Sequence, residues 1–236
     1  NNTYDNAVIE NSKISEKNKI QNNQSMLDDI MNSTQYPKQL KDLALKNEEA
    51  LEFVYDYPAE HVKEHTIDLT EEASMDSVPL FVQWDKRWGY EKYSGNFFAA
   101  SGCGPTTLSM VVVYLTHNRD ASPIAVAKYS KEAGYSVDGS GSSWTLISEG
   151  CRHYGVKAKT VALDESRMKA ELDAGHPIVI NVGPGDFTDT GHFMVITGYD
   201  DEGFSINDPN SIEKSGKRWL FKNISSQIRA VWSMYV

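Results

Sequence analysis

A cysteine at the predicted start of a helix constrains this chain more than any other feature. It lies in the segment Gly102-Cys103-Gly104-Pro105. Proline is favoured in the first turn of a helix, where its missing N–H would be unpaired in any case. After it, apolar residues recur at the spacing of one buried helical face: Leu108, Val111, Val112 and Leu115. The pattern predicts a helix over residues 105–116, with the sulfur of Cys103 at or just before its N-terminus.

This position favours a reactive, anionic thiol. The helix dipole stabilises an anion at the N-terminus, and thiolates placed there have pKa values about 1–5 below the ordinary value of ~8.5. Gly102 and Gly104 leave little side-chain bulk beside the sulfur, so a substrate backbone could approach it. The alternative is that Cys103 is a small, buried apolar residue, and this segment alone does not decide between the two.

A hairpin near the C-terminus predicts a base and a carboxylate for the thiol. His192 begins an apolar, β-branched run typical of a buried strand, residues 200–203 favour a turn, and residues 204–209 favour the return strand. Directly opposed strand residues stand roughly 5 Å apart, and this register brings His192 and Asp208 within about three positions of facing each other. A carboxylate so placed holds an imidazole in the tautomer that accepts a proton from sulfur. Asn207 ranks second for this role, because its amide oxygen can also accept from the ring.

Gln83 is the candidate for stabilising the oxyanion of an acyl-transfer reaction. A side-chain amide and a backbone N–H near the nucleophile can stabilise the negative oxygen of a tetrahedral intermediate. A lone glutamine is usually a solvated surface residue, and His192 alone could equally be an ordinary strand histidine. Both residues gain weight because thiol, imidazole and carboxylate follow the glutamine in order along the chain.

The four candidates lie in segments that resemble papain-like cysteine peptidases of the bacteriocin-leader-processing type. These segments are Gln83-Trp84-Asp85, Gly102-Cys103-Gly104-Pro105-Thr106, Gly191-His192-Phe193 and Asn207-Asp208-Pro209. The sequence looks most like the secreted, stand-alone relatives of that group, and the likeness spans residues 78–236. It departs from the transporter-linked members, because these 236 residues show no membrane spans and no ATP-binding domain.

The resemblance implies a papain-like α+β fold and a peptidase activity without a cofactor. Cys103 would be the nucleophile and His192 the general base and acid, while Asp208 would orient the ring. Gln83 would lie in the oxyanion hole. The resemblance also implies a secreted or cell-surface location. Because Asn1-Asn2-Thr3 does not begin a secretory signal, we expect a processed precursor.

The chain divides into three stretches of different composition. Residues 1–35 are rich in Asn, Ser, Gln and Lys and favour a polar lead-in or linker. Residues 36–77 predict a helical N-terminal extension, with one helix over residues 37–57 that Pro58 ends. Residues 78–236 form the predicted peptidase domain.

Within this predicted domain, helices come first and an antiparallel sheet last, which is typical of an α+β fold. Besides the elements above, the pattern predicts helices over residues 122–133, 144–154 and 164–174, and strands over residues 156–163 and 176–182.

The distribution of charge bears on the partners of the protein. The first 80 residues hold 7 basic and 16 acidic side chains, and so account for −9 of the net charge of −10. The predicted peptidase domain is therefore nearly neutral and lacks the basic footprint of a nucleic-acid-binding protein. No run approaches the ~20 apolar residues of a membrane span. We expect a monomer that acts on a peptide or protein substrate.

The cysteines and histidines leave two alternatives open. Two cysteines allow one disulfide, between Cys103 and Cys151, which would leave no free nucleophile. They do not make a structural zinc site, because there is no second pair. Histidines four residues apart could share a helix face and bind zinc with a nearby carboxylate. The residues for this less favoured alternative are His61, His65, Glu64 and Asp68.

Three functions compete on this sequence. The leading hypothesis is hydrolysis of a peptide or amide bond by the thiol of Cys103. The first alternative is a module that keeps the cleft and binds peptides without chemistry. The second is a cell-wall amidase or an acyl transferase, because papain-like sites support these reactions as well.

Overall fold

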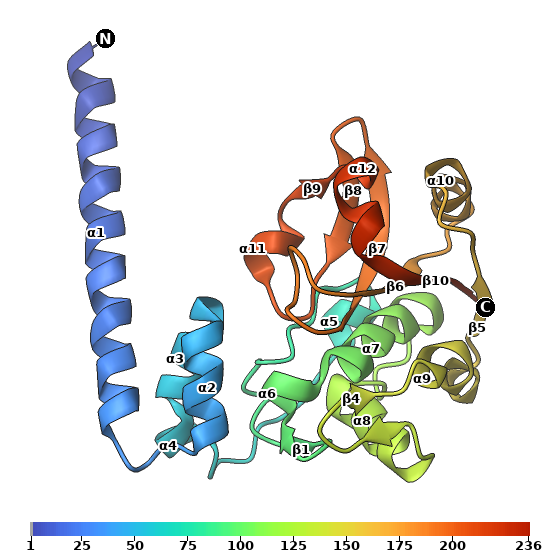
Figure 1. The fold of residues 1–236 in the computed structure, drawn as a ribbon, viewed down its shortest axis with the longest axis horizontal. Helices are drawn as coiled ribbons and strands as arrows, with labels where there is room; N and C mark the ends of the chain where they lie inside the picture. Colours follow the sequence, from blue (N-terminus) through green and yellow to red (C-terminus); the bar gives the residue numbers. More distant parts are fainter. Residues whose placement is uncertain (1) are drawn as a thin grey trace. The chain divides into compact units, whose positions relative to one another are not determined.

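The computed structural model describes residues 2–236, which form two compact units (Figure 1). The first unit ends at Glu64, and the second runs from His65 to Val236.

The first unit begins with one long helix, α1 (Asn2–Asn32). We predicted a polar linker here, and the segment is helical instead. It contains neither glycine nor proline, so no residue with a strong penalty interrupts the helix despite its polar composition. The apolar side chains of Val8, Ile14 and Ile20 are exposed, whereas Ile30 is fully buried.

The rest of this unit is a set of short helices. They are α2 (Lys38–Lys46), the 3-10 helix η1 (Glu48–Ala50), α3 (Leu51–Tyr55) and α4 (Tyr57–Glu60). The prediction of one continuous helix over residues 37–57 is therefore wrong. It is interrupted at Asn47, whose backbone is extended and whose side chain accepts a hydrogen bond from the Glu49 amide at 3.1 Å. Asparagine competes in this way with the helical backbone for hydrogen bonds.

The second unit has eight α-helices and two 3-10 helices. The helices are α5 (Thr70–Ala73), α6 (Phe98–Ser101), α7 (Cys103–Thr116), α8 (Pro123–Glu132), α9 (Thr145–Ser148), η2 (Gly150–Tyr154), α10 (Glu165–Asp173), α11 (Ile212–Ser215), α12 (Phe221–Ile224) and η3 (Ser225–Gln227). The helix predicted over residues 144–154 is thus split into α9 and η2. Gly155 ends it in a left-handed conformation with φ 76°.

The strands of this unit form one large sheet and two small hairpins. The strands are β1 (Lys92–Tyr93), β2 (Asn96–Phe97), β3 (Ser136–Val137), β4 (Gly141–Ser142), β5 (Lys157–Thr160), β6 (Ile178–Val182), β7 (His192–Asp200), β8 (Gly203–Asn207), β9 (Arg218–Trp219) and β10 (Ile228–Tyr235). The large sheet has six strands in the order β5-β10-β6-β7-β8-β9, all paired antiparallel. The helices α5 to α9 precede this antiparallel sheet along the chain, whereas α10, α11 and α12 lie between its strands. The predicted α+β class is confirmed.

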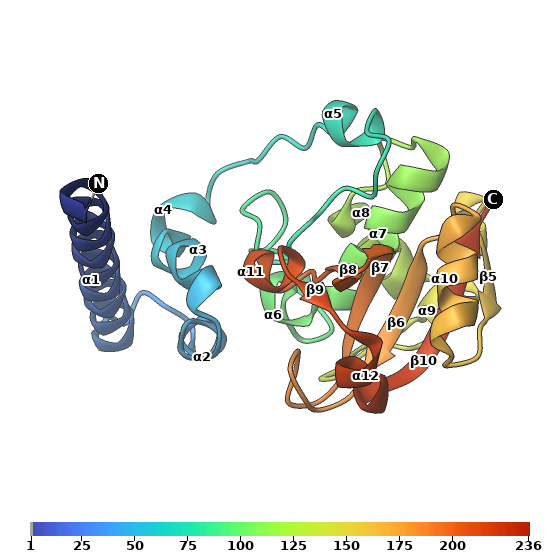
Figure 2. The same cartoon turned by 90° about the horizontal axis from the view of Figure 1, so that it is seen from above.

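Helices cover both faces of the large sheet (Figure 2). Successive residues of a strand point to opposite faces. Phe193 and Val195 of β7 join the buried cluster that contains the apolar residues of α7. Met194 and Ile196 join the cluster that contains Met168 of α10 and residues of α12. The sheet therefore separates two cores, and α7 lies on the face that carries Phe193.

No helix among residues 2–236 combines the length and apolar character that a bilayer crossing requires.

Candidate active site

The thiol of Cys103 stands at the first residue of α7. This helix is anchored to the sheet by a hydrogen bond from the Thr107 hydroxyl to the Phe193 carbonyl, at 3.2 Å. The Cys103 side chain packs against the core under α7 and remains partly exposed. The sequence thus places the sulfur at the positive end of a 14-residue helix, whose residue Thr107 bonds to Phe193 near the start of β7.

The two glycines beside Cys103 have a packing role that the sequence did not reveal. A Cβ on Gly102 would lie 2.6 Å from the ring of Phe98, and one on Gly104 would lie 2.7 Å from the Ser142 hydroxyl. We expected these glycines to leave room for a substrate backbone. The space beside each of them is filled by the protein's own side chains.

Replacing Gly102 by alanine is expected to destabilise the second unit by about 1–3 kcal/mol, because overpacking forces the fully buried Phe98 ring to move. Denaturant unfolding measures the free-energy change. Gly198→Ala is the matched control, since a Cβ there meets no atom within 4 Å. Equal stability of the two variants would contradict this account of Gly102.

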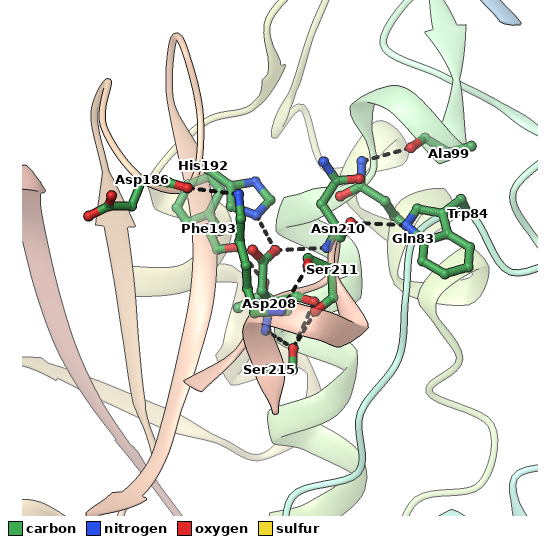
Figure 3. Close-up of polar contacts among 12 residues, drawn as sticks. Gln83, Trp84, Ala99, Asp186, His192, Phe193, Asp208, Asn210, Ser211 and Ser215 are labelled. Atoms are coloured by element: carbon green, nitrogen blue, oxygen red, sulfur yellow. Dashed lines mark hydrogen bonds and ion pairs between the residues drawn. The ribbon is translucent and has the colours of Figure 1, made fainter. Parts of the chain in front are cut away.

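His192 and Asp208 meet at the end of the β7–β8 hairpin (Figure 3). The Nε2 atom of His192 lies 2.7 Å from Oδ1 of Asp208, and both side chains are buried. The hairpin pairs Asp200 with Gly203 and Val195 with Asn207, with a register shift in between. The turn falls where the sequence predicts it, so the imidazole and carboxylate lie within hydrogen-bond reach.

The carboxylate of Asp208 is held by its own loop. Its Oδ1 atom also accepts from the Asn210 amide at 2.8 Å, and its backbone N–H donates to the Ser215 hydroxyl at 2.8 Å. Ser215 in turn donates to the Ser211 carbonyl at 2.6 Å (Figure 3). We did not single out these three residues, although Asp-Pro-Asn is a turn signal, in which an aspartate commonly bonds the amide two residues on.

Asn207, the second candidate for orienting His192, is used elsewhere. Its Nδ2 atom donates to the carbonyls of Val78 and Pro79, at 3.2 and 3.1 Å. These bonds fasten the segment that precedes Gln83 to the end of β8. Of the two candidates, Asp208 therefore makes the contact with the ring.

The charges of Cys103 and His192 support each other. Burial acts to raise the pKa of the Cys103 thiol, but the adjacent His192 ring and the Phe193 backbone outweigh it and hold this pKa below its usual value. Burial acts to lower the pKa of His192, but the Asp208 carboxylate and Cys103 outweigh it and raise this pKa well above its usual value. Both directions favour a thiolate next to an imidazolium.

Gln83 is buried on the chain segment that runs along the end of β8. Its backbone N–H donates to the Pro209 carbonyl at 2.7 Å, and its Nε2 atom donates to the Ala99 carbonyl at 2.8 Å (Figure 3). Next to it, the Trp84 indole donates to the Asn210 carbonyl at 3.1 Å. The amide of Gln83 therefore lies against α6, the helix that leads into Cys103. Gln83 is not a solvated surface residue, which was the alternative for a lone glutamine.

Neither the disulfide nor the zinc site that the sequence left open is present among the described residues. Cys103 and Cys151 are both free, and burial raises the pKa of Cys151 to about 11. No three His, Cys, Asp or Glu side chains gather as metal ligands in the part of the chain that the structure describes. His61 instead bonds the Tyr57 carbonyl through its ring.

A thiol at a helix N-terminus beside a buried imidazole–carboxylate pair, on an α+β domain, is the arrangement expected of a papain-like cysteine peptidase. The chain belongs to the Peptidase_C39 like family, whose model matches residues 75–236. The predicted family is therefore confirmed. No curated protein matches the sequence.

Two solved structures are similar to part of this chain. One is described as a C39-like peptidase from Bacillus anthracis, with 18% identity, a TM-score of 0.41 and coverage of 67% of this chain and 95% of that chain. The other is the peptidase domain of Streptococcus ComA, a bi-functional ABC transporter, with 19% identity, a TM-score of 0.48 and coverage of 67% and 96%.

Proposed function

We propose that this protein is a cysteine peptidase that hydrolyses peptide bonds through a thiolate–imidazolium pair. The observation that carries the proposal is the 2.7 Å hydrogen bond between His192 and Asp208, made by a ring that holds the pKa of the Cys103 thiol below its usual value. Membership of a peptidase family supports the same reaction.

The two ring nitrogens of His192 have different roles. Nε2 of His192 is held by the Asp208 carboxylate, so Nδ1 is the nitrogen left to exchange a proton with the thiol. The Cys103 thiolate attacks the substrate carbonyl, and the imidazolium then gives its proton to the departing amine. The neutral ring next removes a proton from water, which attacks the thioester and releases the acyl group.

Gln83 supports the oxyanion in this proposal. One hydrogen of its Nε2 atom is used by the Ala99 carbonyl, which fixes the amide and leaves the second hydrogen for a substrate oxygen. The backbone N–H of Cys103, at the first residue of α7, has no partner within the helix and is the second donor. Two such donors stabilise the tetrahedral intermediate more than the planar substrate.

Alkylation of Cys103 by iodoacetamide tests the ion pair directly. Because the pKa of this thiol is lowered, we expect its alkylation rate to stay high as the pH falls below the ordinary thiol value of ~8.5. In His192→Ala, the acid limb of the profile of alkylation rate against pH should move to higher pH. Mass spectrometry distinguishes labelling of Cys103 from labelling of Cys151. Cys151 is an internal control that should label slowly, since it is buried and its pKa is raised to about 11. Labelling of Cys103 no faster than a free cysteine at neutral pH would refute the proposal.

A further inference from the structure

The ladder between β7 and β8 ends before it reaches His192 and Asp208. Its last pair at this end is Val195 with Asn207, and both residues of interest lie beyond it. On its other side, His192 pairs with Val182 of β6. The ring and the carboxylate therefore belong to chain segments that the β7–β8 ladder does not hold together at this point. Their 2.7 Å contact depends on other bonds between these segments.

Lys214 of α11 joins the two segments. The helix α11 follows Asp208 along the chain, and the hydroxyl of its Ser215 accepts from the Asp208 backbone N–H at 2.8 Å. The Nζ atom of Lys214 donates to the Asp186 carbonyl at 2.7 Å (Figure 3). Asp186 lies in the β6–β7 loop, residues 183–191, which leads into His192. One side chain thus connects the helix that holds the carboxylate to the loop that carries the ring.

Lys214 is held at its backbone as well as at its charged end. Its N–H donates to the Ser211 hydroxyl and its carbonyl accepts from the Trp219 indole, both at 3.0 Å. The residue is partly buried, and its Nζ atom lies 6.0 Å from the centre of the Phe187 ring. A long side chain loses conformational entropy when it is ordered, and these contacts offset part of that cost. The amine is therefore directed at the β6–β7 loop.

The β6–β7 loop is packed and bonded on its other sides. Phe187 is 6% exposed, and its ring centroid lies 4.5 Å from that of Trp219. The Asp186 N–H donates to Oε1 of Gln227 at 2.8 Å, and Nε2 of Gln227 donates to the Asp186 carboxylate at 2.6 Å. Closely packed segments transmit a displacement instead of absorbing it. A shift at the Asp186 carbonyl therefore reaches the start of β7, where His192 lies.

We propose that Lys214 is a positioning residue, which keeps the His192 ring at hydrogen-bond distance from Asp208 by clamping the β6–β7 loop to α11. The proposal rests on the proposed peptidase function. Lys214 acts through these two segments, so its contribution is to geometry. A misplacement of about 1 Å can lower a catalytic rate about 10²-fold. Since Lys214 is partly exposed and the loop has other contacts, we expect its loss to cost about tenfold.

Lys214→Met removes the hydrogen bond and keeps the length of the side chain. It should lower kcat for peptide cleavage about tenfold and leave KM within about twofold. The acid limb of Cys103 alkylation should move to higher pH, because a displaced carboxylate no longer holds the pKa of His192 high. Lys214→Arg keeps a cationic donor and should restore most of both values. Lys217→Met is the matched control. It removes the same charge close to α11, from an exposed pair with Glu213 at 3.0 Å, and should behave as the wild type.

Thermal unfolding of each variant separates displacement of the ring from loss of the fold. A role in stability alone predicts that Lys214→Met lowers the melting temperature while kcat and the alkylation profile of the folded protein stay unchanged, and this result would overturn the proposal. Equal shifts of the profile in Lys214→Met and Lys217→Met would assign the effect to surface charge and refute the clamp. If the wild type cleaves no peptide, the proposed function fails. The alkylation profile, which needs no substrate, then decides by itself whether Lys214 positions the ring.

Discussion

Replacing Cys103 by alanine is expected to lower kcat for peptide hydrolysis by at least about 10⁴-fold, since a triad acts as a unit and the loss of its nucleophile removes nearly all of its effect. Alanine keeps the small volume of the side chain at the start of α7, so the fold should be unchanged. Cleavage of a mixed peptide pool, followed by mass spectrometry, measures the loss.

Cys151→Ala is the matched control for this variant. Cys151 is fully buried and lies outside the site, so its replacement should leave kcat within a few-fold of the wild type. Purified peptidoglycan incubated in parallel separates a peptidase from a cell-wall amidase, because the two predict different products. If the wild type and Cys103→Ala both bind peptides of the pool and neither cleaves them, the binding module becomes the better account.

The parts of the site that depend on local sequence could be predicted. The turn at residues 200–203 fixes the register of its own hairpin, so the proximity of His192 and Asp208 follows from a few residues. The start of α7 follows in the same way from Pro105 and the apolar spacing behind it. Such contacts need no knowledge of how distant segments pack.

The parts that depend on distant segments could not be predicted. Gln83 bonds the Ala99 carbonyl, and Asn207 bonds the backbone of residues 78 and 79, across 16 and more than 120 residues of chain. No periodicity encodes these pairs. The prediction for α1 was wrong because it gave more weight to the polar composition of the segment than to its lack of glycine and proline.

The second large effect is expected at Asp208. Replacing it by alanine should lower kcat by about 10²–10⁴-fold, because proton transfer by the His192 ring, which Asp208 positions, contributes a factor of this size. The carboxylate fixes Nε2 of His192 at 2.7 Å and is the largest cause that raises the pKa of this ring. Without it, His192 loses both its orientation and the stabilisation of its charged form.

The pH dependence gives Asp208→Ala a signature that simple unfolding would not produce. The pKa of His192 is raised in the folded protein, so the imidazolium that pairs with the thiolate persists at neutral pH. With Asp208 gone, this pKa falls, the ring becomes neutral near pH 7, and the thiol regains its proton. Asp208 also repels the thiolate directly, but this is the smallest of the causes that act on the pKa of Cys103, so the loss of the imidazolium dominates.

The acid limb of Cys103 alkylation should therefore move to higher pH in Asp208→Ala. Asn207→Ala is the matched control, because its amide bonds the carbonyls of Val78 and Pro79 and not the ring. This variant should lose stability, through the loosened segment before Gln83, while its alkylation profile stays where the wild type has it. If Asn207→Ala moved the profile and Asp208→Ala did not, the orienting role would belong to Asn207, and the 2.7 Å contact of Asp208 with His192 would be only structural.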